Sequence, residues 1–127
     1  MTHRVSSGSP YENVIGLSRA VRIGPLIAVA GTAPIAVDGA VSHPGDVYAQ
    51  TRRCLEIALA AVERAGGTVE SVIRTRIMLV DISQWRDAAR AHAEVFANIR
   101  PACTFVGVGR FIDPGWLVEI EVTAVRP

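Results

Sequence analysis

The sequence contains few of the features that mark a specialised class of protein. It has only two cysteines in 127 residues, and neither lies in a CxxC pair or near a histidine at metal-ligand spacing. A disulfide framework and a structural zinc site are therefore not expected. No motif in the chain indicates another metal or a cofactor, so we expect neither.

Long apolar runs and concentrated charge are also missing. No stretch reaches the roughly 18 consecutive apolar residues of a membrane-spanning helix, and the opening MTHRVSSGSPYEN lacks the apolar centre of a signal peptide. Thirteen basic residues balance twelve acidic ones, and no run of like charges is longer than the Arg52–Arg53 pair. We therefore expect a cytoplasmic protein that associates with neither membranes nor nucleic acids.

The composition favours one domain that associates with copies of itself. A chain of 13.5 kDa matches the usual size of a single domain, so we assign residues 1–127 to one unit, with a partly ordered N-terminal segment at 1–14. Hydrophobic residues make up 50% of the chain and the mean hydropathy is +0.30. This apolar content favours an oligomer, in which another subunit covers part of the surface.

Hydrophobic periodicity predicts an α+β fold. Alternation predicts strands, and a change to a helical period predicts two helices, the first closed by Gly66–Gly67 and the second opened by a capping box at 81–84. Cys54 lies on the apolar stripe of the first helix, as a core residue would. Asp38–Gly39 predicts a second hairpin or a longer loop at 35–41. The predicted strands are 18–24, 26–31, 70–80, 103–109 and 116–125, and the predicted helices are 46–65 and 82–97.

This order of elements predicts a single sheet with both helices packed on one face. Such a sheet leaves its other face open, and a subunit interface is the natural cover for it.

Charged residues on two of the strands allow two interpretations. Arg74 and Arg76 share one face of their strand, and Glu119 and Glu121 share one face of theirs. If the strands are neighbours, Arg–Glu pairs across them would each contribute about 0.2–1 kcal/mol. Alternatively, Glu119 lies at the floor of a cleft, where burial raises its pKa and suits it to acid–base chemistry. Spacing does not decide between them.

Two further residues have ordinary structural explanations. His92 has no second ligand three or four residues away on its predicted helix, so it is interpreted as a core histidine. Cys103 follows a proline at the start of a strand, and no base or motif in the sequence would activate its thiol. We interpret Cys103 as a small residue that lines a cleft.

Several segments resemble the RidA/YjgF family, also described as endoribonuclease L-PSP-like. The resemblance extends from Ile15 to Arg126 and is carried by GLSRAVRIG, VAGTAPI, DVYAQTRRCLE, IRPACTFVGV and LVEIEVTAVR. It implies a chorismate-mutase-like subunit in a homotrimer whose sheets form an inner barrel, with ligand clefts between subunits. The activity that it implies is hydrolysis of enamines and imines to 2-oxo acids and ammonia.

The polar residues of the implied cleft are mostly replaced in this chain. The family's arginine, which holds the substrate carboxylate through two parallel hydrogen bonds, corresponds to Cys103, and a thiol supplies neither the charge nor the geometry. Arg100 is a candidate substitute. The carboxylate is kept as Glu119. The positions that the resemblance assigns to the ligand cleft are Leu17, Ala30, Thr32, Ala89, Cys103, Phe105 and Glu119.

These replacements favour a cleft that is more apolar and lacks the arginine of a 2-imino acid deaminase. The first hypothesis is therefore a trimer that binds a small metabolite and does not hydrolyse 2-imino acids efficiently. The alternative is a hydrolase of an enamine, imine or other small activated substrate, in which Glu119 and backbone amides position water. A nuclease, as the family's older name suggests, lacks a basic groove in this sequence.

Overall fold

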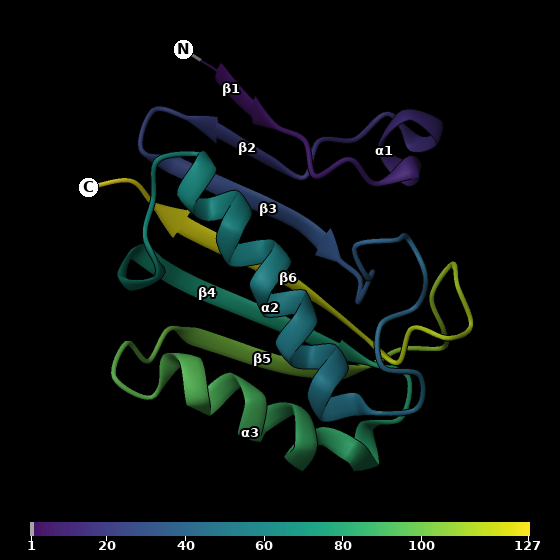
Figure 1. Ribbon diagram of the computed structural model, residues 1–127. Coiled ribbons are helices and arrows are strands. Elements are labelled where there is room, and N and C mark those ends of the chain that lie inside the picture. Colours follow the sequence, from purple (N-terminus) through teal and green to yellow (C-terminus); the bar gives the residue numbers. More distant parts are fainter. Residues whose placement is uncertain (1) are drawn as a thin grey trace.

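The computed structural model describes residues 2–127, and its central feature is one six-stranded sheet (Figure 1). Two long helices, α2 and α3, lie over the same face of this sheet. The predicted α+β architecture, a single sheet with two helices on one face, is confirmed. The strands are β1 Thr2–Val5, β2 Ala20–Ile23, β3 Leu26–Thr32, β4 Val72–Leu79, β5 Ala102–Gly107 and β6 Val118–Val125; the helices are α1 Pro10–Ile15, α2 Val47–Arg64 and α3 Trp85–Phe96, with short 3-10 helices η1 Val69–Ser71 and η2 Ile82–Gln84.

The strands follow the order β1-β2-β3-β6-β4-β5. All neighbours are antiparallel except β4 and β5, which run parallel. Parallel strands need a crossover connection, and α3 provides it between these two. The C-terminal strand β6 therefore lies in the middle of the sheet, between the N-terminal hairpin and β4.

Local sequence signals explain where the first long helix begins and ends. The side chain of Asp46 accepts a hydrogen bond from the backbone N–H of Ala49 at 3.0 Å, which caps the N-terminus of α2. Gly66, at a φ of 98°, adopts the left-handed conformation that follows many helices. Cys54 is fully buried in the core, as predicted, and burial raises the pKa of its thiol well above the ordinary value.

Strand β6 divides the molecule into a packed side and an open side. Val118, Ile120, Val122 and Ala124 are buried beneath the helices, as alternation requires. The side chains between them, including Glu119, face away from this core. The other face of the sheet therefore carries the charged and half-buried residues from which a site can be built.

Of the two alternatives for residues 35–41, a second hairpin or a longer loop, the structure has the loop, with one bridge between Ile35 and Val41. Two details differ from the sequence-based predictions. The N-terminal segment, to which no element was assigned, contains β1 and α1. The helical period over 82–97 predicts Trp85 on the apolar side of that helix, yet Trp85 is 41% exposed. It occupies the first position of α3, where Arg86 stacks on its ring with 4.5 Å between guanidinium and ring centre.

A buried glutamine connects two loops at the N-terminal end of α2. Gln50 is fully buried, and its amide nitrogen donates to the carbonyl oxygens of Gly115 at 3.0 Å and His43 at 3.4 Å. Its amide oxygen accepts from the backbone N–H of Leu117 at 2.9 Å. One side chain thus connects the loop before α2 to the loop before β6.

We predict that Gln50→Met lowers the free energy of unfolding by about 2–4 kcal/mol, because several buried backbone groups lose their partners while the volume is kept. Urea denaturation of the two proteins measures the difference. The exposed substitution Glu63→Gln on the same helix is the control and should change stability by less than about 0.5 kcal/mol. Equal stability of Gln50→Met and the unmodified protein would contradict the proposed role of Gln50.

Candidate functional site

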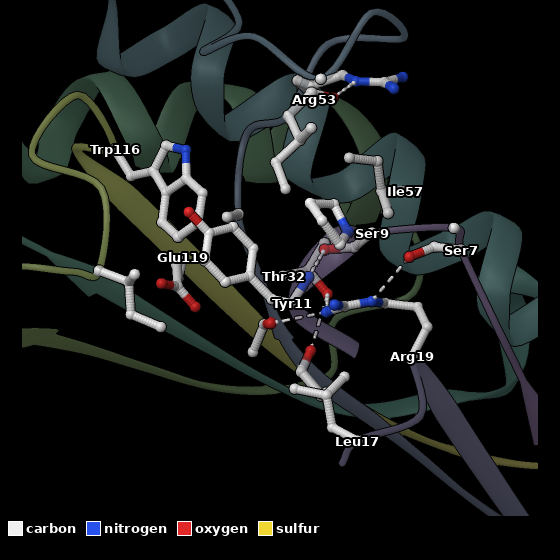
Figure 2. Close-up of a pocket in the computed structure, with 18 of the residues that line it drawn as sticks. Ser7, Ser9, Tyr11, Leu17, Arg19, Thr32, Arg53, Ile57, Trp116 and Glu119 are labelled. Atoms are coloured by element: carbon white, nitrogen blue, oxygen red, sulfur yellow. Dashed lines mark hydrogen bonds between the residues drawn. The ribbon is translucent and has the colours of Figure 1, made fainter. Parts of the chain in front are cut away.

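A cavity of about 550 Å³ opens where the ends of β3 and β6 meet the N-terminal segment (Figure 2). Its size is that of a small-molecule site. The walls come from six parts of the chain: α1 with the loops around it, the end of β3, the loop 33–39, one side of α2, the loop leading into β6, and the start of β6. The lining includes Tyr11, Leu17, Arg19, Gly31, Arg53, Ile57, Trp116 and Glu119.

Glu119 projects from β6 into this cavity. Its backbone neighbour across the sheet is Met78, whereas Arg76 faces Glu121. The two strands are neighbours, as the first interpretation of these charges required, but their register does not give Glu119 an arginine partner. Among residues 2–127 no hydrogen bond or ion pair to the Glu119 carboxyl group is found.

Burial raises the pKa of Glu119, an effect that Arg19 opposes and Glu121 reinforces. The strand next to it has a glycine where the carboxyl group lies: a Cβ on Gly31 would be 3.0 Å from Glu119 Oε1. The pairing of β3 with β6 also shifts register between Val29 and Thr32. The irregular end of β3 thus makes room for a carboxyl group that no protein side chain neutralises.

Arg19 lies at the same end of β3 and is only 6% exposed. Its Nη1 donates to the carbonyl oxygen of Gly31 at 2.7 Å and to Thr32 Oγ1 at 3.3 Å, and its Nε donates to Ser7 Oγ at 3.3 Å (Figure 2). Burial lowers the pKa of Arg19, and the nearby carboxylates of Glu12 and Glu119 counteract this effect. The guanidinium group is therefore charged and held in one position.

Hydrogen bonds to Glu12 hold the N-terminal segment in place beside Arg19. Its carboxylate accepts from Ser6 Oγ at 2.7 Å, from Ser7 Oγ at 2.6 Å and from the Ser7 backbone N–H at 2.9 Å. Burial alone would raise the pKa of Glu12, but the hydrogen bonds from Ser7 and Ser6 and the charge of Arg19 together lower it. A segment that is polar in sequence is thereby ordered as one wall of the cavity.

Aromatic and aliphatic side chains form the rest of the wall. Tyr11 and Trp116 meet edge to face, with 5.4 Å between ring centres and an interplanar angle of 76°. The rim carries Ile15, Val37 and Ile112, which are 54%, 96% and 64% exposed. Exposed apolar side chains gathered around a cavity are typical of a binding site.

The structure brings together only half of the residues assigned to the cleft from the sequence. Leu17, Ala30, Thr32 and Glu119 line the cavity. The other four do not line it within one subunit, and all belong to α3, β5 or the turn between them. They are Ala89, Arg100, Cys103 and Phe105.

Those four residues have other surroundings in the subunit. Cys103 is exposed on the edge strand β5. Arg100 has a φ of 58° in the turn before that strand. Phe105 lies against His92, with 6.5 Å between ring centres. His92 itself is hydrogen-bonded to Thr75 Oγ1 at 2.8 Å, and burial lowers its pKa, as expected of a core histidine.

Most residues of the cavity lining were not identified from the sequence, including its two arginines and its two large aromatic residues. Arg19, Tyr11, Arg53 and Trp116 line the cavity, yet each follows an ordinary local pattern. An arginine beside a strand and a tyrosine in a polar N-terminal segment both suggest solvent exposure. Only the folding of the N-terminal segment against β3 brings the first two together, so no local signal would have revealed them.

Within residues 2–127 no three histidine, cysteine or acidic side chains are arranged to hold a metal ion. Over the same residues, no helix is both long and apolar enough to cross a bilayer.

Comparison with known proteins gives consistent results. A family model described as Endoribonuclease L-PSP matches residues 9–126. A protein of Streptomyces coelicolor, itself uncharacterized, is 42% identical over 97% of this chain and 91% of its own length. A RutC family protein of Pyrococcus abyssi is 30% identical over 86% of this chain and 85% of its own. The crystal structure of a YjgF/YER057c/UK114 family member from Mycobacterium tuberculosis is 46% identical, with a TM-score of 0.89 over 98% of this chain and 99% of that one.

We predict that the carboxyl group of Glu119 titrates above the ordinary glutamate value of about 4.3, because burial penalises its charged form. An NMR titration of the side-chain carboxyl carbon measures this pKa. The folded state then binds this proton more tightly than the unfolded state, so the stability contributed by the protonated group is lost as pH rises through the folded pKa. Glu119→Gln should remove that part of the pH dependence. A Glu119 pKa at or below the ordinary value would contradict the assignment.

Proposed function

Because the chain belongs to the RidA/YjgF family, also described as the endoribonuclease L-PSP family, we propose that it binds a small metabolite in a cleft between the subunits of a homotrimer. The observation that carries this proposal is the cavity itself, where Glu119 lies unpaired beside apolar and aromatic walls. A half-buried carboxyl group with a raised pKa and no protein partner, lying in a cavity, is a candidate functional group.

A trimer would unite the two halves of the cleft. The cavity lies at the end of β3 and β6, whereas Cys103 and Phe105 belong to β5, on the far side of β4 in the same sheet. A cleft that contains both sets, as the family resemblance implies, needs a second subunit. Leu26 and Val125 support this arrangement, because they face each other on the open side of the sheet and are 52% and 36% exposed.

Hydrolysis of 2-imino acids is not part of the proposed function. That reaction requires a fixed cation for the substrate carboxylate, and the family's position for it holds Cys103. Arg100 lies two residues before β5 but is absent from the cavity lining. The cavity arginines offer no surplus of positive charge either, because Arg19 is balanced by Glu12, and Arg53 pairs with Glu56 at 3.3 Å.

A second function is favoured by the raised pKa of Glu119. A carboxylate of this kind is suited to take a proton from water. Attack of that water on the carbon of a neutral C=NH compound would form a carbinolamine. Proton transfer to its nitrogen and loss of the hydroxyl proton would then break the C–N bond, release ammonia and leave a carbonyl group. In this alternative the protein is a hydrolase of a small neutral substrate.

The same charge balance argues against a nuclease. Backbone phosphates bind where lysines and arginines outnumber acidic groups. The cavity arginines are paired as described, and the formal net charge of the whole chain is only +1. We therefore do not extend the word endoribonuclease in the family description to this chain.

We predict that the protein does not accelerate the decay of 2-iminopropionate, generated in place by an amino-acid oxidase, relative to buffer. The Cys103→Arg variant should be equally inactive, because the family's other polar positions hold Leu17, Ala30 and Ala89 in this chain. Ammonia release followed with time measures both. Faster decay with the unmodified protein would show that another cation replaces the missing arginine, and activity of the variant alone would show that Cys103 was the only obstacle.

We predict a particle mass in solution of three times the 13.5 kDa of one chain. Sedimentation equilibrium measures this mass. Leu26→Glu, which places a charge on the open face without touching the cavity lining, should shift the equilibrium toward monomers by burying an unpaired carboxylate. The exposed helix substitution Glu63→Gln should leave the mass unchanged. A monomer of the unmodified protein would rule out the intersubunit cleft.

A further inference from the structure

Two charged side chains in the cavity keep unused hydrogen-bonding capacity. The Nε and Nη1 atoms of Arg19 are engaged by protein oxygens, but no hydrogen bond from its Nη2 is found among residues 2–127. Glu119 likewise makes none. The single buried side-chain nitrogen or oxygen without a partner in this part of the chain is Arg22 Nε. Nη2 of Arg19 and the oxygens of Glu119 therefore retain solvent access. Both residues line the cavity.

These two groups do not satisfy each other. Arg19 and Glu119 do not form an ion pair, because no guanidinium nitrogen of Arg19 lies within 4.0 Å of a carboxyl oxygen of Glu119. They are nevertheless near enough that each influences the pKa of the other. The cavity thus presents a donor from Arg19 and an acceptor from Glu119 that are not bonded to each other.

The charges around the cavity disfavour an anionic ligand. Arg19 and Arg53 are the cations of the lining, and Glu12, Glu56 and Glu119 lie beside them. With Glu119 ionised, this group carries a net negative charge. A carboxylate placed on Arg19 would also approach Glu119 and would bind only if a proton were taken up there.

The remaining wall favours a ring. The edge-to-face pair of Tyr11 and Trp116 offers aromatic contacts to a flat ligand. Leu17 and Ile57 add aliphatic surface (Figure 2). A volume of about 550 Å³ accommodates a ring with one polar substituent and leaves space for water.

We infer that the ligand of this cavity is a neutral ring compound bearing a carboxamide-type group, whose N–H donates to Glu119 and whose C=O accepts from Nη2 of Arg19. This inference rests on the proposed function and names the class of molecule that the cleft takes. An amide fits because it presents one donor and one acceptor side by side, without a net charge that would have to be neutralised.

The acceptor role of Glu119 makes binding dependent on pH. The ionised carboxyl group accepts a hydrogen bond more strongly than the protonated one. The charged or titratable groups that act on Glu119 are Arg19 before β2 and Glu121 on β6, and the thiol of Cys54 on α2 also interacts with it. Affinity for a neutral amide should therefore fall as pH is lowered through the pKa of Glu119.

Three probes of similar size test the inference at pH 7: benzamide, benzoate and toluene, each titrated into the full-length protein and followed by NMR. We expect benzamide to bind about tenfold more tightly than either of the others, because only benzamide satisfies both groups without a repulsive charge. Its affinity should decrease as the pH is lowered toward 4.

Matched variants assign the effect to the named carboxyl group. Glu119→Gln keeps the shape but replaces a charged acceptor by a neutral one, so benzamide should bind about fivefold more weakly and its pH dependence should disappear. Glu63→Gln, exposed on α2 and outside the cavity lining, is the control and should leave the affinity unchanged. Gly31→Ala, which places a Cβ 3.0 Å from Glu119 Oε1, should displace the carboxyl group and weaken benzamide without changing charge.

The possible results separate this inference from the proposed function. Preference for benzoate, or equal binding of benzamide and toluene, would overturn the inference and leave a small-molecule cleft in place. The same would follow if Glu119→Gln bound benzamide as tightly as the unmodified protein. Failure of all three probes to bind at millimolar concentration would count against both the inference and the proposed function.

Discussion

The buried guanidinium group of Arg19 connects parts of the chain that otherwise have no reason to meet. Removing such a charge from water is costly, and the cost is offset only if carbonyl, hydroxyl and carboxylate oxygens surround it. Gly31, Thr32 and Ser7 provide the oxygens, and Glu12 provides the nearest negative charge. The N-terminal segment must therefore fold over the end of β3, and the cavity is the space that this closure leaves.

The position of β6 explains why a carboxyl group faces that space. With β3 on one side and β4 on the other, β6 buries every second side chain beneath the helices. The pairing of β3 with β6 shifts register between Val29 and Thr32, which leaves space beside β3 on the face of the sheet away from the helices. Glu119 occupies this opening beside Gly31, where a larger residue would displace it. The same alternation that builds the core thus directs an unpaired carboxyl group into the cavity.

The helices and strands were largely predictable, because apolar periodicity and caps are local signals. The prediction was weaker where a residue's role depends on distant partners. Trp85 matches an apolar helix position and yet remains 41% exposed at the start of α3. Arg19 has the pattern of a surface residue and is buried. Glu119 was singled out from the sequence, but its separation from the arginines of β4 followed only from the register, which pairs it with Met78.

The amino-acid sequence by itself determined the fold class and the core face of each helix and strand, together with membership of the family, since these depend on periodicity and on motifs a few residues long. Only the tertiary structure decided which side chains share a cavity. The closeness of Tyr11, Arg19, Trp116 and Glu119 results from long-range strand register and from the docking of an irregular N-terminal segment. Both are set by the sum of contacts across the whole domain, and no local stretch of sequence encodes that sum.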